Sequence, residues 1–189
     1  MKKILFAASE AVPFMKTGGL ADVTGSLPKY FDKKNYDVRV ILPKYVCMEE
    51  RWKGQLHFLC HFYVNLSWRK QYVGIFETTY DGITYYLVDN EFYFAGNAPY
   101  NNIYEDVEKF AFFSKAVLEA LPYLDFCPDI IHCHDWQTGL LPVFLRTLYG
   151  DEEYYTGIKT VFSIHNLKFQ GRWKLPAVMD ITGLPEQIF

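Results

Sequence analysis

Short apolar runs recur along the chain, separated by polar segments that contain glycine, proline or aspartate. Four of them are short and rich in aliphatic residues, which is typical of strands in a buried parallel sheet. We therefore predict strands over the following ranges: Ile4–Ala8, Tyr36–Leu42, Asp129–Cys133 and Lys159–Ile164.

The middle of the chain has a different pattern. Three strand-like runs follow one another closely, at 56–66, 72–80 and 83–88. Asp81-Gly82 separates the last two, and this dipeptide is a strong signal for a two-residue hairpin turn. The pattern predicts an antiparallel excursion from an otherwise parallel sheet.

Helical periodicity is clearest between Tyr104 and Leu121, where apolar residues recur every three or four positions and Pro122 ends the pattern. We predict further helices from Gly19 to about Asp32 and from Leu140 to Leu148. Gly25 and Pro28 mark a kink or break in the former. The segment from 175 to 189 has weak helical character.

Strands that alternate with helices predict an α/β fold, here a single domain over residues 1–189. We expect a Rossmann-like parallel sheet with helices on both faces and right-handed crossovers. Ligands of such sheets bind beyond the carboxyl ends of the strands. Three polar motifs follow predicted strands, at 10–22, 134–139 and 165–171, so we expect them to form one composite site.

Composition excludes several classes of protein. Half of the residues are hydrophobic, which argues against a disordered chain, and the net charge of −3 lacks the basic excess of a nucleic-acid binder. No apolar run reaches the roughly 18 residues of a membrane span, and the N-terminal run is too short for a signal peptide. The four cysteines lack a CxxC pair, which favours reduced thiols in a cytoplasmic protein.

The segment from Lys16 to Asp22, Lys-Thr-Gly-Gly-Leu-Ala-Asp, lies between a predicted strand and a predicted helix. Its glycines, Gly18 and Gly19, allow close approach of a ligand to the backbone, and amides at a helix start favour an anion. Lys16 adds a positive charge, so the segment suits a diphosphate. It is neither a Walker loop nor a GxGxxG fingerprint, and a tight turn with a solvated lysine and a helix-capping Asp22 explains it equally well.

Two further clusters carry candidate chemistry. His132 and His134 share one face of a strand, so a metal site with Asp135 is conceivable, but a second pair of ligands at suitable spacing is missing. Core histidines explain them well. His165, followed by Asn166, could donate or accept a hydrogen bond in a pocket, or simply bridge to backbone. Several aromatic residues near polar segments could stack on sugar rings: Tyr93, Tyr100, Tyr104, Trp136 and Trp173.

The segment from Lys16 to Val23 resembles the N-terminal signature of the bacterial glycogen synthase and plant starch synthase family. Further blocks resemble that family in the same order along essentially the whole chain. They are Ser9–Phe14, Val38–Pro43, Asp89–Phe94, Glu105–Ser114, His134–Gly139 and Ile164–Gly171. Gln137 departs from the pattern, because some members carry histidine there.

The resemblance implies a retaining glucosyltransferase of the two-domain GT-B fold, which moves glucose from ADP-glucose to an α-1,4-glucan without metal or cofactor. It implies that Lys16, Gly18 and Gly19 contact the donor and that Asp22 lies near it. It places His165, with Asn166, beside the transferred glucose, and Asp135 and Trp136 along the cleft on the acceptor side.

Members of this family are more than twice as long as this chain. We therefore expect the N-terminal half of a synthase, as a cloned domain or a truncated product, that lacks the C-terminal nucleotide-binding domain and is inactive alone. Two alternatives stay open. One is a non-catalytic glucan-binding module, and the other is a metal-dependent hydrolase built on His132, His134 and Asp135. The choice between ADP-glucose and UDP-glucose and the oligomeric state are also open.

Overall fold

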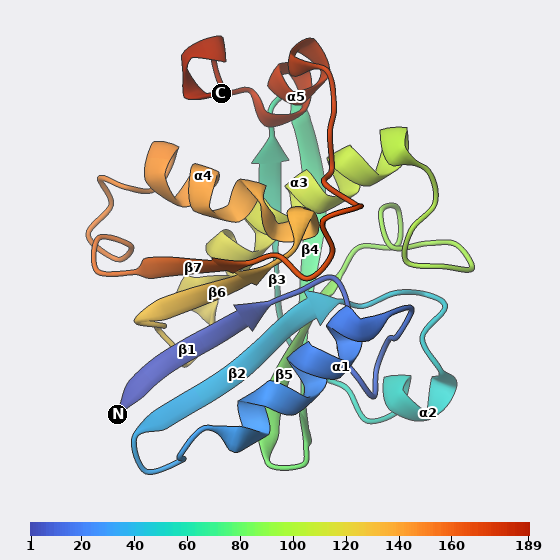
Figure 1. Ribbon diagram of the computed structural model, residues 1–189, viewed down its shortest axis with the longest axis vertical. Coiled ribbons are helices and arrows are strands. Elements are labelled where there is room, and N and C mark those ends of the chain that lie inside the picture. The colour runs from blue at the N-terminus through green and yellow to red at the C-terminus, as the bar shows by residue number, and fades with distance from the viewer.

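A computed structural model of the chain shows one mixed sheet of seven strands in the order β3-β4-β5-β2-β1-β6-β7 (Figure 1). It describes residues 1–189, apart from the side chains of Ile103 and Tyr104. The strands are β1 (Lys2–Ala7), β2 (Tyr36–Pro43), β3 (His57–Leu66), β4 (Arg69–Tyr80), β5 (Ile83–Asp89), β6 (Ile130–His134) and β7 (Lys159–Ser163). The predicted α/β fold is confirmed, and every predicted strand is present.

The strand β1 occupies the centre of the parallel part of the sheet, paired with β2 on one side and β6 on the other. Leu5, Phe6 and Ala7 are all completely buried. Leu5 and Ala7 belong to one apolar cluster, and Phe6 belongs to a second cluster on the opposite face. Burial on both faces explains why the sequence of β1 is apolar without alternation.

The antiparallel excursion is confirmed as β3 and β4, with β5 returning to pair in parallel with β2. Asp81 and Gly82 between β4 and β5 both have positive φ, 51° and 72°. Such a turn is of the type I′ kind and matches the twist of a hairpin. β3 and β4 are longer than the other strands and extend toward the C-terminal helix (Figure 1).

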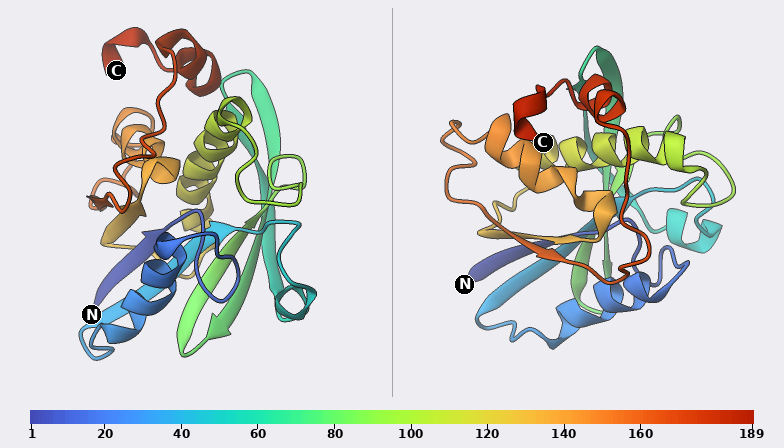
Figure 2. Two further views of the ribbon diagram at one scale, coloured as in Figure 1. Left: turned by 45° about the vertical axis from the view of Figure 1, so that its right-hand side comes forward. Right: turned by 45° about the horizontal axis from the view of Figure 1, so that its top comes forward.

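Helices cover both faces, with α1 on one side of the sheet and α3 and α4 on the other (Figure 2). The helices are α1 (Gly19–Ser26), α2 (Glu50–Lys53), α3 (Ile103–Ala120), α4 (Leu140–Thr147) and α5 (Leu175–Thr182). Short 3-10 turns are η1 (Leu27–Tyr30), η2 (Leu121–Tyr123), η3 (Trp136–Thr138) and η4 (Glu186–Ile188). The short α2 has no counterpart among the predicted elements.

The break predicted from Gly25 and Pro28 is confirmed, because the α-helix ends between these two residues. α1 continues through Gly25 to Ser26 and then tightens into η1, which has Pro28 in its first turn. A Cβ at Gly25 would lie 2.4 Å from the carbonyl oxygen of Val12. This glycine therefore serves close packing of α1 on the loop after β1.

Strand order places the three polar motifs together. After β1 the chain continues to β2 on one side, whereas β6 and β7 lie on the other side of β1. The order of the sheet thus reverses at β1, and the segments that follow β1, β6 and β7 meet at this switch point. No helix among the described residues has the length and hydropathy needed to cross a membrane.

Candidate active site

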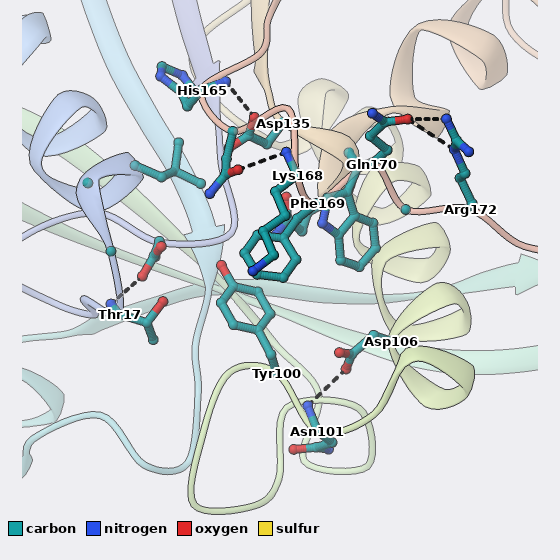
Figure 3. A pocket seen from close by; sticks show the side chains of 18 of the residues that line it. Thr17, Tyr100, Asn101, Asp106, Asp135, His165, Lys168, Phe169, Gln170 and Arg172 are labelled. Atoms are coloured by element: carbon teal, nitrogen blue, oxygen red, sulfur yellow. Dashed lines mark hydrogen bonds between the residues drawn. The ribbon is translucent and has the colours of Figure 1, made fainter.

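A cavity of about 1130 Å³ lies at this switch point, and the segments after β1, β5, β6 and β7 contribute its walls (Figure 3). Six of the eight predicted site residues line it, namely Gly18, Gly19, Asp135, Trp136, His165 and Asn166. The tertiary structure therefore brings together motifs that are more than 100 positions apart in the sequence.

Gly18 and Gly19 form the entry to α1. Gly18 is the N-cap residue, and no side chain caps the helix there. A Cβ at Gly19 would meet no atom within 4 Å, so the backbone at this position borders open space in the cavity. The predicted approach of a ligand to the glycine backbone is sterically open at Gly19.

Lys16 and Asp22 lie beside the cavity and do not line it. Lys16 Nζ donates to both carboxylate oxygens of Asp22, at 2.6 and 2.8 Å. Both side chains are about half exposed, so this ion pair adds little stability. Asp22 lies in the first turn of α1, where the helix dipole stabilises a carboxylate, so the explanation of Asp22 by its place at the helix start is retained.

Glu10 is a component of the site to which the sequence analysis assigned no role. Its carboxylate is buried, lines the cavity and accepts the backbone N–H of Thr17. Burial raises the pKa of Glu10, and hydrogen bonds from the amides of Thr17 and Gly18 oppose that shift. The Thr17 amide, which precedes the helix, is therefore already occupied by an internal carboxylate. The amides that we predicted to favour an anion lie at the helix start, from Gly19 onward.

Asp135 holds an unusual backbone conformation at the end of β6. Its φ of 59° and ψ of 178° lie in a region that favours glycine. Its backbone N–H donates to the carbonyl oxygen of Ser163 at 2.9 Å, and its Oδ1 accepts the backbone N–H of His165 at 2.7 Å (Figure 3). The carboxylate therefore ties the loop after β7 to the end of β6.

The histidines form a row that crosses from β6 to β7. His134 Nδ1 lies 2.9 Å from His165 Nε2, and His132 Nε2 lies 2.7 Å from Ser163 Oγ. Burial, with the neighbouring His132 and His165, lowers the pKa of His134 to about 3. Burial, and to a lesser extent the neighbouring His165, also lowers the pKa of His132. His134 is neutral at ordinary pH.

The metal site considered for His132, His134 and Asp135 is not supported by the arrangement of the described residues. Within the part of the chain whose side chains are described, no group of three His, Cys, Asp or Glu is placed to hold a metal ion. Cys133, on the opposite side of β6 from His132 and His134, is buried in the larger apolar cluster. His132 bonds to Ser163 of β7, and His134 bonds to His165 in the loop after β7.

Trp136 forms an aromatic wall of the cavity. Its ring lies 5.2 Å from that of Phe110 and 5.0 Å from that of Trp173, measured between centroids. Gly171 has a φ of 58°, and a Cβ there would lie 2.7 Å from the Trp136 ring. A second cavity of about 790 Å³ adjoins the first and also includes Trp136 and Trp173 in its lining.

The remaining aromatic candidates separate by burial. Tyr100 lines the cavity, and its hydroxyl lies 2.8 Å from Ser9 Oγ. Tyr93 is buried and donates its hydroxyl to Glu108, so it belongs to the core. The side chain of Tyr104 lies outside the described residues.

The loop after β7 adds basic groups that sequence analysis missed. Lys168 and Arg172 both line the cavity. Arg172 donates to Gln170 Oε1 through its Nε at 3.0 Å, and Asn166 Oδ1 accepts the backbone N–H of Lys168 at 2.9 Å (Figure 3). Lys168 lies within the motif at 165–171, which had already been placed at the site, and that was the available signal. Arg172 lies one position beyond this motif.

Comparison with known proteins identifies the family. The family described as starch synthase catalytic domain matches residues 3–189. The chain belongs to this family. It is 65% identical over its whole length to a glycogen synthase of Lachnoclostridium phytofermentans, and covers 40% of that protein. It is 50% identical to a glycogen synthase of Desulforamulus reducens, over 99% of this chain and 39% of that protein.

A solved member of the starch synthase family has the same fold. The catalytic domain of starch synthase IV from Arabidopsis thaliana, bound to ADP and acarbose, matches with a TM-score of 0.84 and 28% identity. The match covers 97% of this chain and 37% of that one. The expected GT-B type of α/β fold is confirmed. The chain spans about 40% of the length of its curated relatives.

Proposed function

We propose that this chain forms the N-terminal half of a glycogen synthase. The whole protein would transfer glucose from ADP-glucose to the non-reducing end of an α-1,4-glucan, with retention at the anomeric carbon, in the cytoplasm. The observation that carries the proposal is the cavity at the switch point, where Gly19, Asp135 and His165 from three separate motifs meet. The family match over residues 3–189 supports it.

The donor diphosphate is proposed to bind near the start of α1. The first-turn amides from Gly19 onward lack partners within the helix, and the helix dipole favours negative charge there. Lys16 lies in the same loop, and its exposed ion pair with Asp22 is weak enough to exchange for a phosphate. Lys168 and Arg172 add positive charge from the opposite wall of the cavity.

The sugars are proposed to occupy the space between His165 and the aromatic wall. His165, followed by Asn166, would lie beside the transferred glucose. Asp135 and Trp136 would border the acceptor, since they lie on the wall that carries Trp173 and faces Tyr100 across the cavity. Aromatic rings present flat apolar faces that suit the C–H faces of pyranoses.

In the proposed reaction the bond between the anomeric carbon and the diphosphate breaks, and the oxygen of a glucan hydroxyl forms the new bond on the same face. The proton of that hydroxyl passes to the departing diphosphate. Charge on the departing diphosphate is stabilised by positioned N–H groups and basic side chains. No cofactor takes part. This chain would supply only one wall of that cleft, so we expect it to be inactive alone.

The decisive experiment measures glucosyl transfer from labelled ADP-glucose to glycogen. This chain is compared with the full-length protein that carries it, and UDP-glucose is supplied in parallel. We expect the full-length protein to transfer glucose and the isolated chain to transfer none. Transfer by the isolated chain would refute the claim of incompleteness, and absence of transfer from either donor by the full-length protein would refute the synthase.

The second candidate is a non-catalytic glucan-binding module, which the cluster of Tyr100, Trp136 and Trp173 at the cavity favours. The two candidates differ in their dependence on Lys16. Glucan binding that survives Lys16→Ala, together with no transfer by the full-length protein, would support the module. Loss of transfer in full-length Lys16→Ala with glucan binding retained supports the synthase.

A further inference from the structure

The row of histidines at the ends of β6 and β7 has a geometry that a purely structural core does not require. His132 and His134 stack with centroids 4.1 Å apart, and His134 stacks on His165 at 5.2 Å with the ring planes 16° apart. His134 is completely buried, whereas His165 is exposed at the cavity. One buried ring thus supports the ring that faces the ligand space.

A hydrogen bond between two imidazoles needs one protonated and one bare nitrogen. The 2.9 Å contact joins His134 Nδ1 to His165 Nε2, so one of these two nitrogens carries the proton. The other nitrogen of His134, Nε2, is buried and has no hydrogen-bond partner among the described residues. Whether His134 Nε2 carries a proton decides whether His134 donates or accepts the hydrogen bond to His165.

A buried N–H without a partner is rarer and more costly than a bare acceptor in the same place. His134 Nε2 is therefore the bare nitrogen, and Nδ1 of the neutral ring carries the proton. His134 then donates to His165 Nε2. It follows that a neutral His165 carries its own proton on Nδ1.

The next residue completes the arrangement. Asp135 Oδ1 accepts the backbone N–H of His165 at 2.7 Å, while His134 contacts the ring of the same residue. Two consecutive residues at the end of β6 thus hold both the backbone and the side chain of His165. We propose that His134 is a positioning residue that fixes the ring of His165 and its Nδ1–H tautomer at the cavity.

The positioning role of His134 depends on the proposed function only in its expected effect on glucosyl transfer. With Nε2 engaged by His134, Nδ1–H is the remaining polar group of the His165 ring. His165 then acts as a hydrogen-bond donor to a ligand oxygen and not as a base. Neutral His134, whose pKa is lowered by burial, is consistent with this arrangement.

The test is nitrogen NMR of the full-length protein labelled with ¹⁵N-histidine, with the His165 signals assigned by their loss in His165→Gln. We expect the wild-type protein to show His165 with a protonated Nδ1 and a bare Nε2. A protonated Nε2 on neutral His165 overturns the proposal. This measurement needs no substitution at His134 and is independent of any transfer activity.

Two variants at His134 then test positioning. His134→Asn places an amide near the position of Nδ1 and can still donate, whereas His134→Leu cannot. We expect His134→Leu to give mixed tautomers at His165 and about a tenfold lower kcat with little change in KM, as expected for loss of one hydrogen bond. His134→Asn should retain the wild-type tautomer and most of the activity.

His132 provides the matched control, because it stacks in the same row but bonds to Ser163. His132→Leu should leave the His165 signals unchanged, and equal disturbance by both leucine variants would overturn the proposal. If the expected tautomer is found in a protein that transfers no glucose, the proposed function fails while the positioning role stands. If transfer is found with the other tautomer, the positioning role alone fails.

Discussion

At the scale of single residues, the site depends on groups held in costly states. Asp135 keeps a positive φ that glycine tolerates far better, and it uses its carboxylate to hold His165. Strain of this kind is expected where surrounding structure and function both depend on it. Substitutions at Asp135 can separate the free-energy cost of its positive φ from the benefit of its hydrogen bond to His165.

Asp135→Gly should release about 1–3 kcal/mol of backbone strain and lose a hydrogen bond of about 1.5–3 kcal/mol. We therefore expect a free energy of unfolding close to that of the wild type, and a clear loss of kcat/KM in the full-length protein. Asp135→Asn, which keeps an acceptor oxygen, is the control and should retain more activity. Urea unfolding and the glucosyl transfer assay measure the two effects, and full activity in Asp135→Gly would contradict the role of the carboxylate.

His134 predicts a pH dependence of stability. Its pKa is about 3 in the folded chain, against the ordinary histidine value of 6.5 in the unfolded one. A lowered pKa means that the unfolded state takes up the proton first. The contribution of neutral His134 to the free energy of unfolding is therefore fully present above pH 6.5. It is lost by about 1.4 kcal/mol per pH unit as the pH falls toward 3.

Urea unfolding between pH 7 and pH 4 measures this slope. His134→Asn lacks a titrating group, so its slope should be lower than that of the wild type by about one proton. His61, an exposed histidine on β3, provides the control, and His61→Asn should leave the slope unchanged. Equal slopes in the wild type and in His134→Asn would show that His134 is already charged in the folded chain.

At the scale of elements, α1 is positioned by the loop that precedes it. Gly25 lets the helix approach Val12, and the Thr24 hydroxyl donates to the carbonyl oxygen of Glu10 at 2.6 Å. Glu10 in turn accepts the Thr17 amide at the helix entry. The helix, the loop and the glycines at the cavity therefore form one unit.

Gly25→Ala should disturb this unit, because the new Cβ would meet the backbone of Val12 at 2.4 Å. We expect a loss of about 1–3 kcal/mol in the free energy of unfolding, as for overpacked cores. Gly157→Ala is the control, because a Cβ there meets nothing within 4 Å. Thermal and urea unfolding compare the two, and an unaffected Gly25→Ala would show that the loop moves freely.

At the scale of the whole molecule, β7 forms one edge of the sheet and is poorly covered. Four apolar residues on β7 and the loop after it are 43–73% exposed and border the second cavity. This β7 patch consists of Phe162, Ile164, Leu167 and Phe169. Exposed patches of this kind, on an edge strand with unpaired backbone groups, promote association.

We expect the isolated chain to self-associate through the β7 patch as its concentration rises. Phe162→Lys should reduce that association, since it places a charge within the patch and on the edge strand. Tyr30→Lys, at a residue 84% exposed on η1, is the control and should have no effect. Light scattering over a concentration series measures both, and equal behaviour of the two variants would exclude the patch as the contact.

The sequence by itself determined the strands, the hairpin and the place where the motifs meet. These follow from local causes: buried strands need apolar runs, Asp81-Gly82 accepts positive φ, and parallel strands bring their carboxyl ends to one edge. The role of the individual side chains required the tertiary structure. The contact of His134 with His165 joins residues 31 positions apart. It depends on the register between β6 and β7, whereas a strand pattern reveals only which face a residue occupies. The occupation of the Thr17 amide by Glu10 depends in the same way on how the loop after β1 folds back onto α1.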